Sequence, residues 1–506
     1  MKFGKQAGTM VFLALLILPL FTQSNELLDY FFSSPGEEEL WKNMNECTTG
    51  LASGNATPDG RPLLWKNRDV GNANQEFHYY DDGRIPFISI TYRSETDEYY
   101  GGVNAEGFAL ENSNSYNLAG GPYRNGFVNG GDDDGKIHTM ALSTCRTVDD
   151  FEHFLDSTNT DGRTLNSNYG AIDAFGDAAM FEAAGYSYTR CDAIDAPGGF
   201  LIRSNYSYSG NGLNNRPDFW GPHRHDSSYE RFREAVSKNE LTPLYVFQHV
   251  IRNVSVAGVD PYPLPYDGFF EDYPYGCLPN GEAVCRNSTR AIVVVQGVRA
   301  GGRPDDAILW AFGGSQLTTV ATPLWVRAGS VPEEFDGANG GRICERGVEL
   351  LSWVYTNGNG PQSVDTWKLT NPEGTGLWDY TLPLEQWAYN KTQQFVHSPQ
   401  FSYDRLETFQ NQMAAQIADS LELWKPFRTV SDVVTPRFEN GGITLGWGEV
   451  SEQRDGMSPS EYHVHRSPEP FRTGLEGTLL SVVQERQYHD QNPLPGAGYY
   501  KIVAYY

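Results

Sequence analysis

The chain has 506 residues, a length that predicts two or three folded units. Of these residues 39% are hydrophobic and 13% aromatic, a composition that excludes a disordered protein. It carries 38 basic and 64 acidic side chains, a formal net charge of −26. A field of that sign repels phosphate groups, which argues against nucleic acid and anionic membranes as partners. Solubility is the simplest explanation of the acidity.

The first 24 residues have the pattern of a secretory signal peptide. Lys2 and Lys5 precede an apolar run at 10–21, and small or polar residues follow that run. The run has 12 residues, fewer than the roughly 20 that span a bilayer. We therefore expect a secreted or periplasmic protein without a membrane-spanning segment. Residues 25–46 are acidic and contain a Ser-Ser-Pro-Gly break, which is typical of a short pro-segment.

Residues 47–69 predict a hairpin of two strands joined by an Asp-Gly turn at 59–60. This hairpin returns Asp69 to the backbone of Cys47. If Cys47 becomes the first residue of the chain, its α-amine (unperturbed pKa about 7.7–8.0) can take the proton of its thiol (about 8.5). A carboxylate beside the amine, such as that of Asp69, would orient it. Cys47 is therefore the candidate nucleophile.

Later segments indicate a layered α+β domain at 47–426. The sequence predicts strands at 87–92, 99–103, 108–110, 292–295 and 307–312, a hairpin at 171–182, and helices at 148–155 and 404–424. Residues 430–506 differ, because alternating strands at 443–447, 462–466 and 499–503 are separated by turn residues. This segment resembles a fibronectin type III-like module, a small all-β sandwich.

Four motifs resemble those of the N-terminal-nucleophile hydrolases, in the group of choloylglycine hydrolases, penicillin V acylases and acyl-coenzyme A:6-aminopenicillanic acid acyltransferases. They are the Cys-Thr-Thr start at 47 with its downstream aspartate, Gly-x-Asn-x-x-Gly at 102–107, Arg-Ser-Asn-Tyr at 203–206 and Ser-x-x-x-Arg at 227–231. The resemblance extends over most of residues 47 to about 330. It implies a four-layer αββα sandwich and scission between Glu46 and Cys47.

The resemblance also implies a role for each site residue. Asp69 is the carboxylate near the amine, and Asn114 supplies an oxyanion site, with Asn112 as a rival for that role. Asn205 is the second oxyanion donor, and Arg231 completes the polar network. The implied reaction is thiolate attack on the carbonyl of a small N-acyl amide, followed by hydrolysis, and it requires no cofactor.

One position departs from the family pattern. The choloylglycine branch carries an arginine at or near the position of Lys66, whereas here an arginine appears at Arg68. Because lysine is a weaker bidentate partner, both cations stay candidates for supporting the nucleophile, and specificity for bile salts stays open. Two alternative functions stay open: an acyltransferase that passes the acyl group to an amine, and an inactive secreted binding or adhesion protein.

The six cysteines include one plausible disulfide pair, because Cys277 and Cys285 bracket a turn-rich loop. Two clusters could suggest metal. The acidic run at 132–135 lacks the spaced ligands of a calcium loop, and the histidines at 223–226 have no second cluster of ligands. We therefore expect no metal, and the sequence leaves the substrate and the oligomeric state open.

Overall fold

The computed structural model describes residues 46–505, except for 71–74, 94–96, 120–133, 272, 338–339, 357–362, 373, 425–426, 430–436, 440–441, 448–458, 468–477 and 495–498. The expected signal peptide, most of the expected pro-segment and residues 132–133 of the acidic run at 132–135 lie outside the described residues. Among the described helices, none combines the length and the apolarity that crossing a membrane requires.

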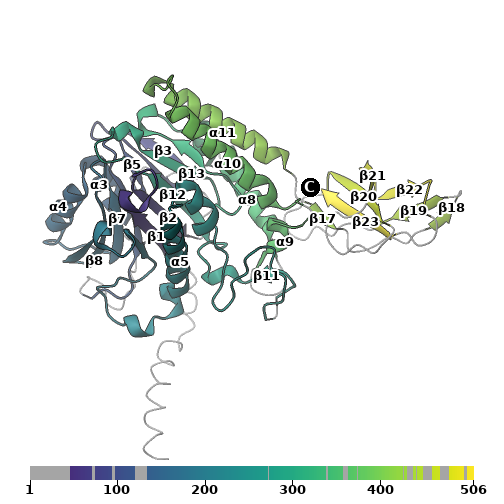
Figure 1. Cartoon of the computed structure of the whole chain (residues 1–506), viewed down its shortest axis with the longest axis horizontal. Coiled ribbons are helices and arrows are strands. Elements are labelled where there is room, and N and C mark those ends of the chain that lie inside the picture. Colours follow the sequence, from purple (N-terminus) through teal and green to yellow (C-terminus); the bar gives the residue numbers. More distant parts are fainter. Residues whose placement is uncertain are drawn as a thin grey trace, which may run out of the picture. The chain divides into compact units, whose positions relative to one another are not determined.

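A six-stranded antiparallel sheet contains the predicted hairpin (Figure 1). Its strands in spatial order are β10 (Phe200–Arg203), β1 (Glu46–Ala52), β2 (Leu63–Asp69), β12 (Thr289–Gln296), β13 (Ile308–Phe312) and β14 (Thr322–Leu324). In the hairpin, Glu46 pairs with Asp69, and Cys47 pairs with Arg68. Gly60 has a φ of 71° in the connecting turn, a conformation that favours glycine. The two predicted strands and their pairing are confirmed, and the pairing brings Asp69 to the start of β1. The connection between them is longer than an Asp-Gly turn, because it spans 53–62 and includes a 3-10 turn at Gly54–Ala56.

A seven-stranded antiparallel sheet follows the chain order strand by strand. Its strands are β3 (Gln75–Tyr80), β4 (Phe87–Tyr92), β5 (Gly102–Asn104), β6 (Ala109–Asn114), β7 (Ser167–Ile172), β8 (Ala178–Ala183) and β9 (Tyr188–Asp192). Between β5 and β6, Asn104 Oδ1 accepts the backbone N–H groups of Glu106 (3.0 Å) and Phe108 (3.1 Å). Gly107 has a φ of 76° in the same turn. The Gly-x-Asn-x-x-Gly motif thus forms the turn that leads into β6 and towards Asn114.

The two large sheets share one apolar core. Leu51, Leu64 and Val293 of the six-stranded sheet belong to the same buried cluster as Ile88 and Val103 of the seven-stranded sheet. Period-two alternation places every second side chain of β1 and β2 in this core. The backbone of Cys47 is therefore fixed by a sheet that is packed on both faces.

Helices cover the other face of each sheet. Side chains of α3 (Asp134–Thr144) and α4 (Val148–Thr158) pack with Tyr169 of the seven-stranded sheet. Phe232 of α5 (Pro222–Lys238) packs with Trp65 of the six-stranded sheet, with ring centroids 6.2 Å apart. The chain therefore combines helices with antiparallel sheets, as the α+β expectation stated, and α4 confirms the predicted helix at 148–155.

The remaining described elements begin with a small three-stranded sheet of β11 (Cys277–Leu278), β16 (Ser363–Asp365) and β15 (Tyr355–Thr356). The other helices are α6 (Pro243–Tyr245), α7 (Glu333–Asp336), α8 (Gly341–Val354), α9 (Thr366–Leu369), α10 (Leu377–Val396) and α11 (Leu406–Leu423). Leu406, Met413, Ile417 and Leu421 of α11 are buried, which confirms the predicted helix at 404–424.

The C-terminal strands form two sheets around their own apolar cluster, which includes Trp447, Tyr462 and Ile502. One sheet has the order β17 (Phe427–Thr429), β23 (Tyr499–Tyr505), β20 (Glu461–Ser467) and β21 (Thr478–Val483). The other has the order β18 (Arg437–Glu439), β19 (Gly442–Gly446) and β22 (Gln487–Asp490). The three strands predicted in this segment are confirmed.

The expected disulfide between Cys277 and Cys285 is not formed, and both side chains are free thiols. Burial raises the pKa of the Cys277 thiol to about 12, and it raises the pKa of the Cys285 thiol further. Hydrogen bonding closes the intervening loop instead, because Asn280 Nδ2 donates to the carbonyl of Cys285 at 2.7 Å. The disulfide prediction was therefore wrong.

Candidate functional site

Cys47 lies in β1 and is almost fully buried, with 3% of its surface exposed. Its cross-strand neighbour Arg68 places its guanidinium 3.7 Å from the centroid of the Tyr100 ring, which belongs to the core between the sheets. Directly opposed residues project to the same face of a sheet. The Cys47 side chain therefore projects towards the seven-stranded sheet, whereas Glu46 and Asp69 project to the face covered by α5.

The segment after β10 carries Asn205 and is fixed through its backbone. Asn205 N–H donates to the carbonyl of Trp220 (2.9 Å), and Asn205 C=O accepts the N–H of Tyr116 (3.0 Å). A buried ion pair between Arg203 Nε and Glu182 Oε1 (2.6 Å) ties the end of β10 to β8. These contacts hold the backbone of Asn205 in place beside Tyr116 and Trp220.

The Asn205 side chain joins three parts of the site. Its Oδ1 accepts the backbone N–H of Cys47 (3.1 Å) and Arg224 Nη2 (2.7 Å), and its Nδ2 donates to the carbonyl of Asn114 (3.0 Å). The first two groups are donors and the third is an acceptor, so the orientation of the carboxamide is determined by its partners. The nitrogen that becomes the amine of a processed Cys47 is thus held by Asn205.

Two carboxylates and two guanidiniums lie beside that nitrogen. Glu46 Oε2 accepts from Arg224 Nη1 (2.5 Å) and from Arg286 Nη2 (2.7 Å). Arg286 Nε also forms an ion pair with Asp69 Oδ2 (3.0 Å), and Thr289 Oγ1 donates to Asp69 Oδ1 (2.5 Å). We call Arg224 and Arg286 the arginine pair.

The protonation of these groups is set by burial and by their partners. Burial acts to raise the pKa of Glu46, but Arg286 and Arg224 outweigh it and hold that pKa below its usual value. For Asp69 burial prevails and raises the pKa, although Arg286 and Arg224 oppose it. Burial also lowers the pKa of Arg224. Glu46 is therefore the carboxylate that the arginine pair stabilises best.

Arg231, which the family resemblance nominated, lies elsewhere on α5. Its guanidinium is 5.0 Å from the centroid of the Tyr262 ring and 3.6 Å from the carboxylate of Glu234, and it lines a cavity of about 540 Å³. Arg224, seven residues earlier on the same helix, is the arginine that contacts Asn205. The structure thus brings Cys47 together with Asp69, Asn114 and Asn205, as the sequence predicted, but not with Arg231.

The contacts of Lys66, Asn112 and Asn114 distinguish the residues that the sequence left as alternatives. Lys66 Nζ donates to the carbonyl of Tyr100 (3.0 Å) and to Asn112 Oδ1. Asn112 Nδ2 donates to Ser167 Oγ (2.9 Å), so its side chain is used between the sheets. Asn114 is the one of the two asparagines whose backbone contacts Asn205.

Sequence reasoning missed four residues of this site: Arg224, Arg286, Thr289 and Tyr116. Arg224 and Arg231 are about two helical turns apart on one face of α5, so periodicity could not choose between them. Burial raises the pKa of the Tyr116 hydroxyl well above its usual value, and the nearby Glu46 and Cys47 add to this. The Tyr116 ring centroid is 6.0 Å from that of Phe219, so an aromatic pair adjoins the site.

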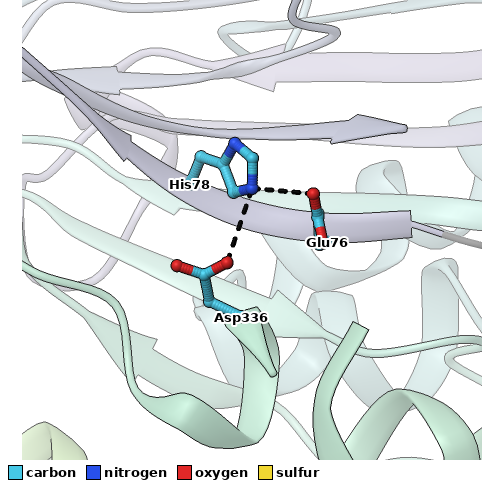
Figure 2. Close-up of side chains that lie close together, drawn as sticks. All are labelled: Glu76, His78 and Asp336. Carbon is cyan, nitrogen blue, oxygen red and sulfur yellow. Dashed lines mark ion pairs between the residues drawn. The ribbon is translucent and has the colours of Figure 1, made fainter. Parts of the chain in front are cut away.

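A second cluster of polar side chains lies between β3 and α7 (Figure 2). His78 Nε2 is 2.7 Å from Glu76 Oε1 and 3.5 Å from Asp336 Oδ1. One ligand atom from each residue lies within 4.8 Å of the others, and these groups are ligand types for transition metals. The cluster shares no residue with the network around Cys47, and we assign it no part in the reaction.

Comparison with known proteins gave matches to solved structures alone. No protein-family model and no curated sequence matched the chain. A mutant of conjugated bile acid hydrolase from Clostridium perfringens matches with a TM-score of 0.33 and 11% identity, covering 52% of this chain and 88% of that one. A second variant of that enzyme matches with a TM-score of 0.35 and 10% identity, covering 55% and 92%. Penicillin V acylase from Agrobacterium tumefaciens matches with a TM-score of 0.33 and 14% identity, covering 55% and 86%.

Proposed function

We propose that the chain is the precursor of an amide hydrolase whose nucleophile is Cys47 after scission of the Glu46–Cys47 bond. One observation carries the proposal: the backbone nitrogen of Cys47 donates to Asn205 Oδ1, and Asn205 also contacts Asn114 and Arg224. Scission turns this nitrogen into an α-amine beside its own thiol. The amine then has a suitable pKa to act as the base.

The reaction proceeds in two steps. The α-amine of Cys47 takes the thiol proton, and the sulfur attacks the amide carbonyl to form a tetrahedral intermediate. The C–N bond then breaks, the leaving amine receives the proton, and a thioester with Cys47 is left. Water hydrolyses this thioester and regenerates the thiol, so no cofactor takes part.

Two donors are proposed for the oxyanion of the intermediate. A carboxamide carries two N–H donors, and the Asn205 side chain uses one on the carbonyl of Asn114. We assign the other, together with the backbone N–H of Asn114, to the oxyanion. Asp69 and Arg286 hold the charge balance beside the amine, and Arg224 orients Asn205.

The proposal includes the domain organisation of the enzyme and its export. The helices packed on the outer faces of the two sheets support a four-layer αββα sandwich for the catalytic domain at 47–426. The separate cluster around Trp447 supports a fibronectin type III-like module at 430–506. The apolar run at 10–21 supports export as a secreted or periplasmic protein, and residues 25–46 would be removed afterwards.

The test is the mature N-terminus combined with the reactivity of Cys47. Intact-mass analysis of the exported protein should give a chain beginning at Cys47, and iodoacetamide should label it there and abolish cleavage of N-acyl p-nitroanilides. Cys47→Ala and Cys47→Ser should stay in the precursor form and be inactive. Active enzyme that still carries residues 25–46, or near-normal turnover by Cys47→Ala, would disprove the mechanism.

A further inference from the structure

The residue before the proposed scission site has an unusual environment for a segment that is to be discarded. The carboxylate of Glu46 is bound by both members of the arginine pair, and 16% of its side chain is exposed. The side chains of Arg224 and Arg286 are 2% and 11% exposed. A removable residue therefore occupies a built anion site next to Cys47.

Removal of Glu46 changes the electrostatics of this site. In the precursor the arginine pair faces the carboxyl groups of Glu46 and Asp69, and after scission the carboxyl of Asp69 is the one left in this group. A buried guanidinium that loses its carboxylate is strongly destabilised. The mature site is therefore suited to accept another anion where the carboxylate of Glu46 lay.

The chemistry of scission indicates which part of a substrate supplies that anion. If the Cys47 sulfur attacks the carbonyl of Glu46, the intermediate is a thioester in which Glu46 is the acyl group. The acyl-enzyme of catalysis is a thioester at the same sulfur. The side chain of Glu46 in the precursor and the acyl chain of a substrate therefore branch from equivalent carbonyl carbons.

We infer that the mature enzyme prefers amides whose acyl group carries a terminal carboxylate at the reach of a glutamate side chain, and that Arg224 and Arg286 bind this carboxylate. The inference rests on the proposed function and specifies its substrate class. The simplest such acyl group is glutaryl, which has the carbon skeleton of a glutamyl residue without the amino group. Charge-assisted bonds to arginine are stronger than neutral ones and give the selectivity.

Two nearly isosteric probes test the inference on the full chain purified in its mature form. Glutaryl-p-nitroanilide carries the carboxylate, and the corresponding terminal carboxamide is neutral. We expect kcat/KM for the glutaryl probe to exceed that for the neutral probe about 10-fold or more, since hydrogen bonds to charged groups contribute roughly 1.5–3 kcal/mol. Equal cleavage of both probes would overturn the inference and leave the proposed function intact. Cleavage of neither probe, by a chain shown to begin at Cys47, would contradict the inference. The proposed function is tested separately, because iodoacetamide-sensitive cleavage of other N-acyl anilides would still support it.

Variants assign the preference to the arginine pair. Arg286→Gln should reduce the ratio of the two kcat/KM values towards one, whereas Arg233→Gln, on an exposed part of α5, should leave the ratio unchanged. If Arg286→Gln fails to mature, competition on wild-type enzyme replaces it. The half-amide of glutarate, which carries one carboxylate, should inhibit more strongly than the neutral diamide. A retained ratio in mature Arg286→Gln, or equal inhibition by the half-amide and the diamide, would show that the arginine pair does not bind the acyl carboxylate.

Discussion

Glu46 and Asp69 lie directly opposite each other in the register of the β1–β2 hairpin, and the guanidinium of Arg286 contacts both carboxylates. Like charges opposite each other on neighbouring strands are destabilising. Arg286 forms ion pairs with both carboxylates and so offsets this repulsion at the end of the hairpin that contains Cys47. The position of the proposed scission bond is therefore fixed by a residue more than two hundred positions away in the sequence.

Glu46→Gln should slow scission of the Glu46–Cys47 bond about 10-fold, because the neutral amide loses the charge-assisted bonds to the arginine pair. Pulse-chase expression with intact-mass analysis measures the fraction of chains that begin at Cys47. Glu230→Gln, an exposed change on α5, serves as the control and should process normally. An unchanged rate for Glu46→Gln would mean that its carboxylate does not position the bond.

Asn205→Ala should lower kcat by roughly 10²–10³, the usual effect of losing one oxyanion donor. It should also accumulate as precursor, since Asn205 holds the Cys47 nitrogen. Asn211→Ala is the matched control, because the hydrogen bonds of Asn211 to Asn117 use its backbone. Full activity in mature Asn205→Ala would remove Asn205 from the mechanism.

Two arginines of α5, Arg224 and Arg231, should differ in the effect on kcat/KM when each is changed to glutamine. Arg224→Gln should lower kcat/KM about 10-fold or more, since it removes a buried charge-assisted bond to Asn205. Arg231→Gln should keep the wild-type value, because its guanidinium contacts Tyr262 and Glu234. The reverse order of effects would support the role that the family resemblance gave to Arg231.

The free energy of unfolding should decrease as the pH rises, because of Glu111, which is completely buried on β6. Burial raises its pKa to about 8 from an ordinary 4.5, although Lys66 and Thr49 oppose the shift. Between these values the folded chain keeps a proton that the unfolded chain has released, so the free energy of unfolding decreases by about 1.4 kcal/mol per pH unit from this group. Glu111→Gln in a Cys47→Ala background should remove that slope in urea unfolding measured from pH 5 to 8. An identical pH dependence in the two proteins would show that Glu111 is ionised in the folded chain.

A chain that ends at residue 426 should keep its activity. The C-terminal strands pair with one another in the described residues, and they contribute none of the residues around Cys47. Equal kcat/KM for the truncated and full chains, with thermal unfolding as the check on folding, is the expected result. Loss of turnover in a folded, processed truncation would show that the C-terminal segment shapes the site.

The sequence predicted those parts of the site that local patterns encode. The Asp-Gly signal at 59–60 placed a reversal of the chain between two strand patterns that pair Cys47 with Arg68, and the Asn104 turn precedes the strand that ends at Asn114. Asn205 and Asn114 were implied by the family resemblance of the motifs that contain or precede them. Each of these residues sits at a turn or a strand terminus, where the identity of a few neighbouring residues determines the backbone.

The arginine pair could not be predicted in the same way. Arg224 is identified by which end of α5 approaches β1, and Arg286 by the pairing of β12 with β2. Both depend on packing between segments distant in sequence. The prediction of a Cys277–Cys285 disulfide failed for a related reason, because the spacing of two cysteines gives the length of the loop between them but not the orientation of their side chains in the folded chain.

The orientation of Asn205 has a consequence for how the precursor and the mature enzyme are related. Its Oδ1 faces two donors, the Cys47 nitrogen and Arg224. Scission changes that nitrogen from an amide to an amine, which is still a donor. The carboxamide of Asn205 therefore does not need to rotate. The Asn205 NH₂ group keeps its direction, and one arrangement of Asn205 can serve first the chain's own peptide bond and then every later substrate without refolding.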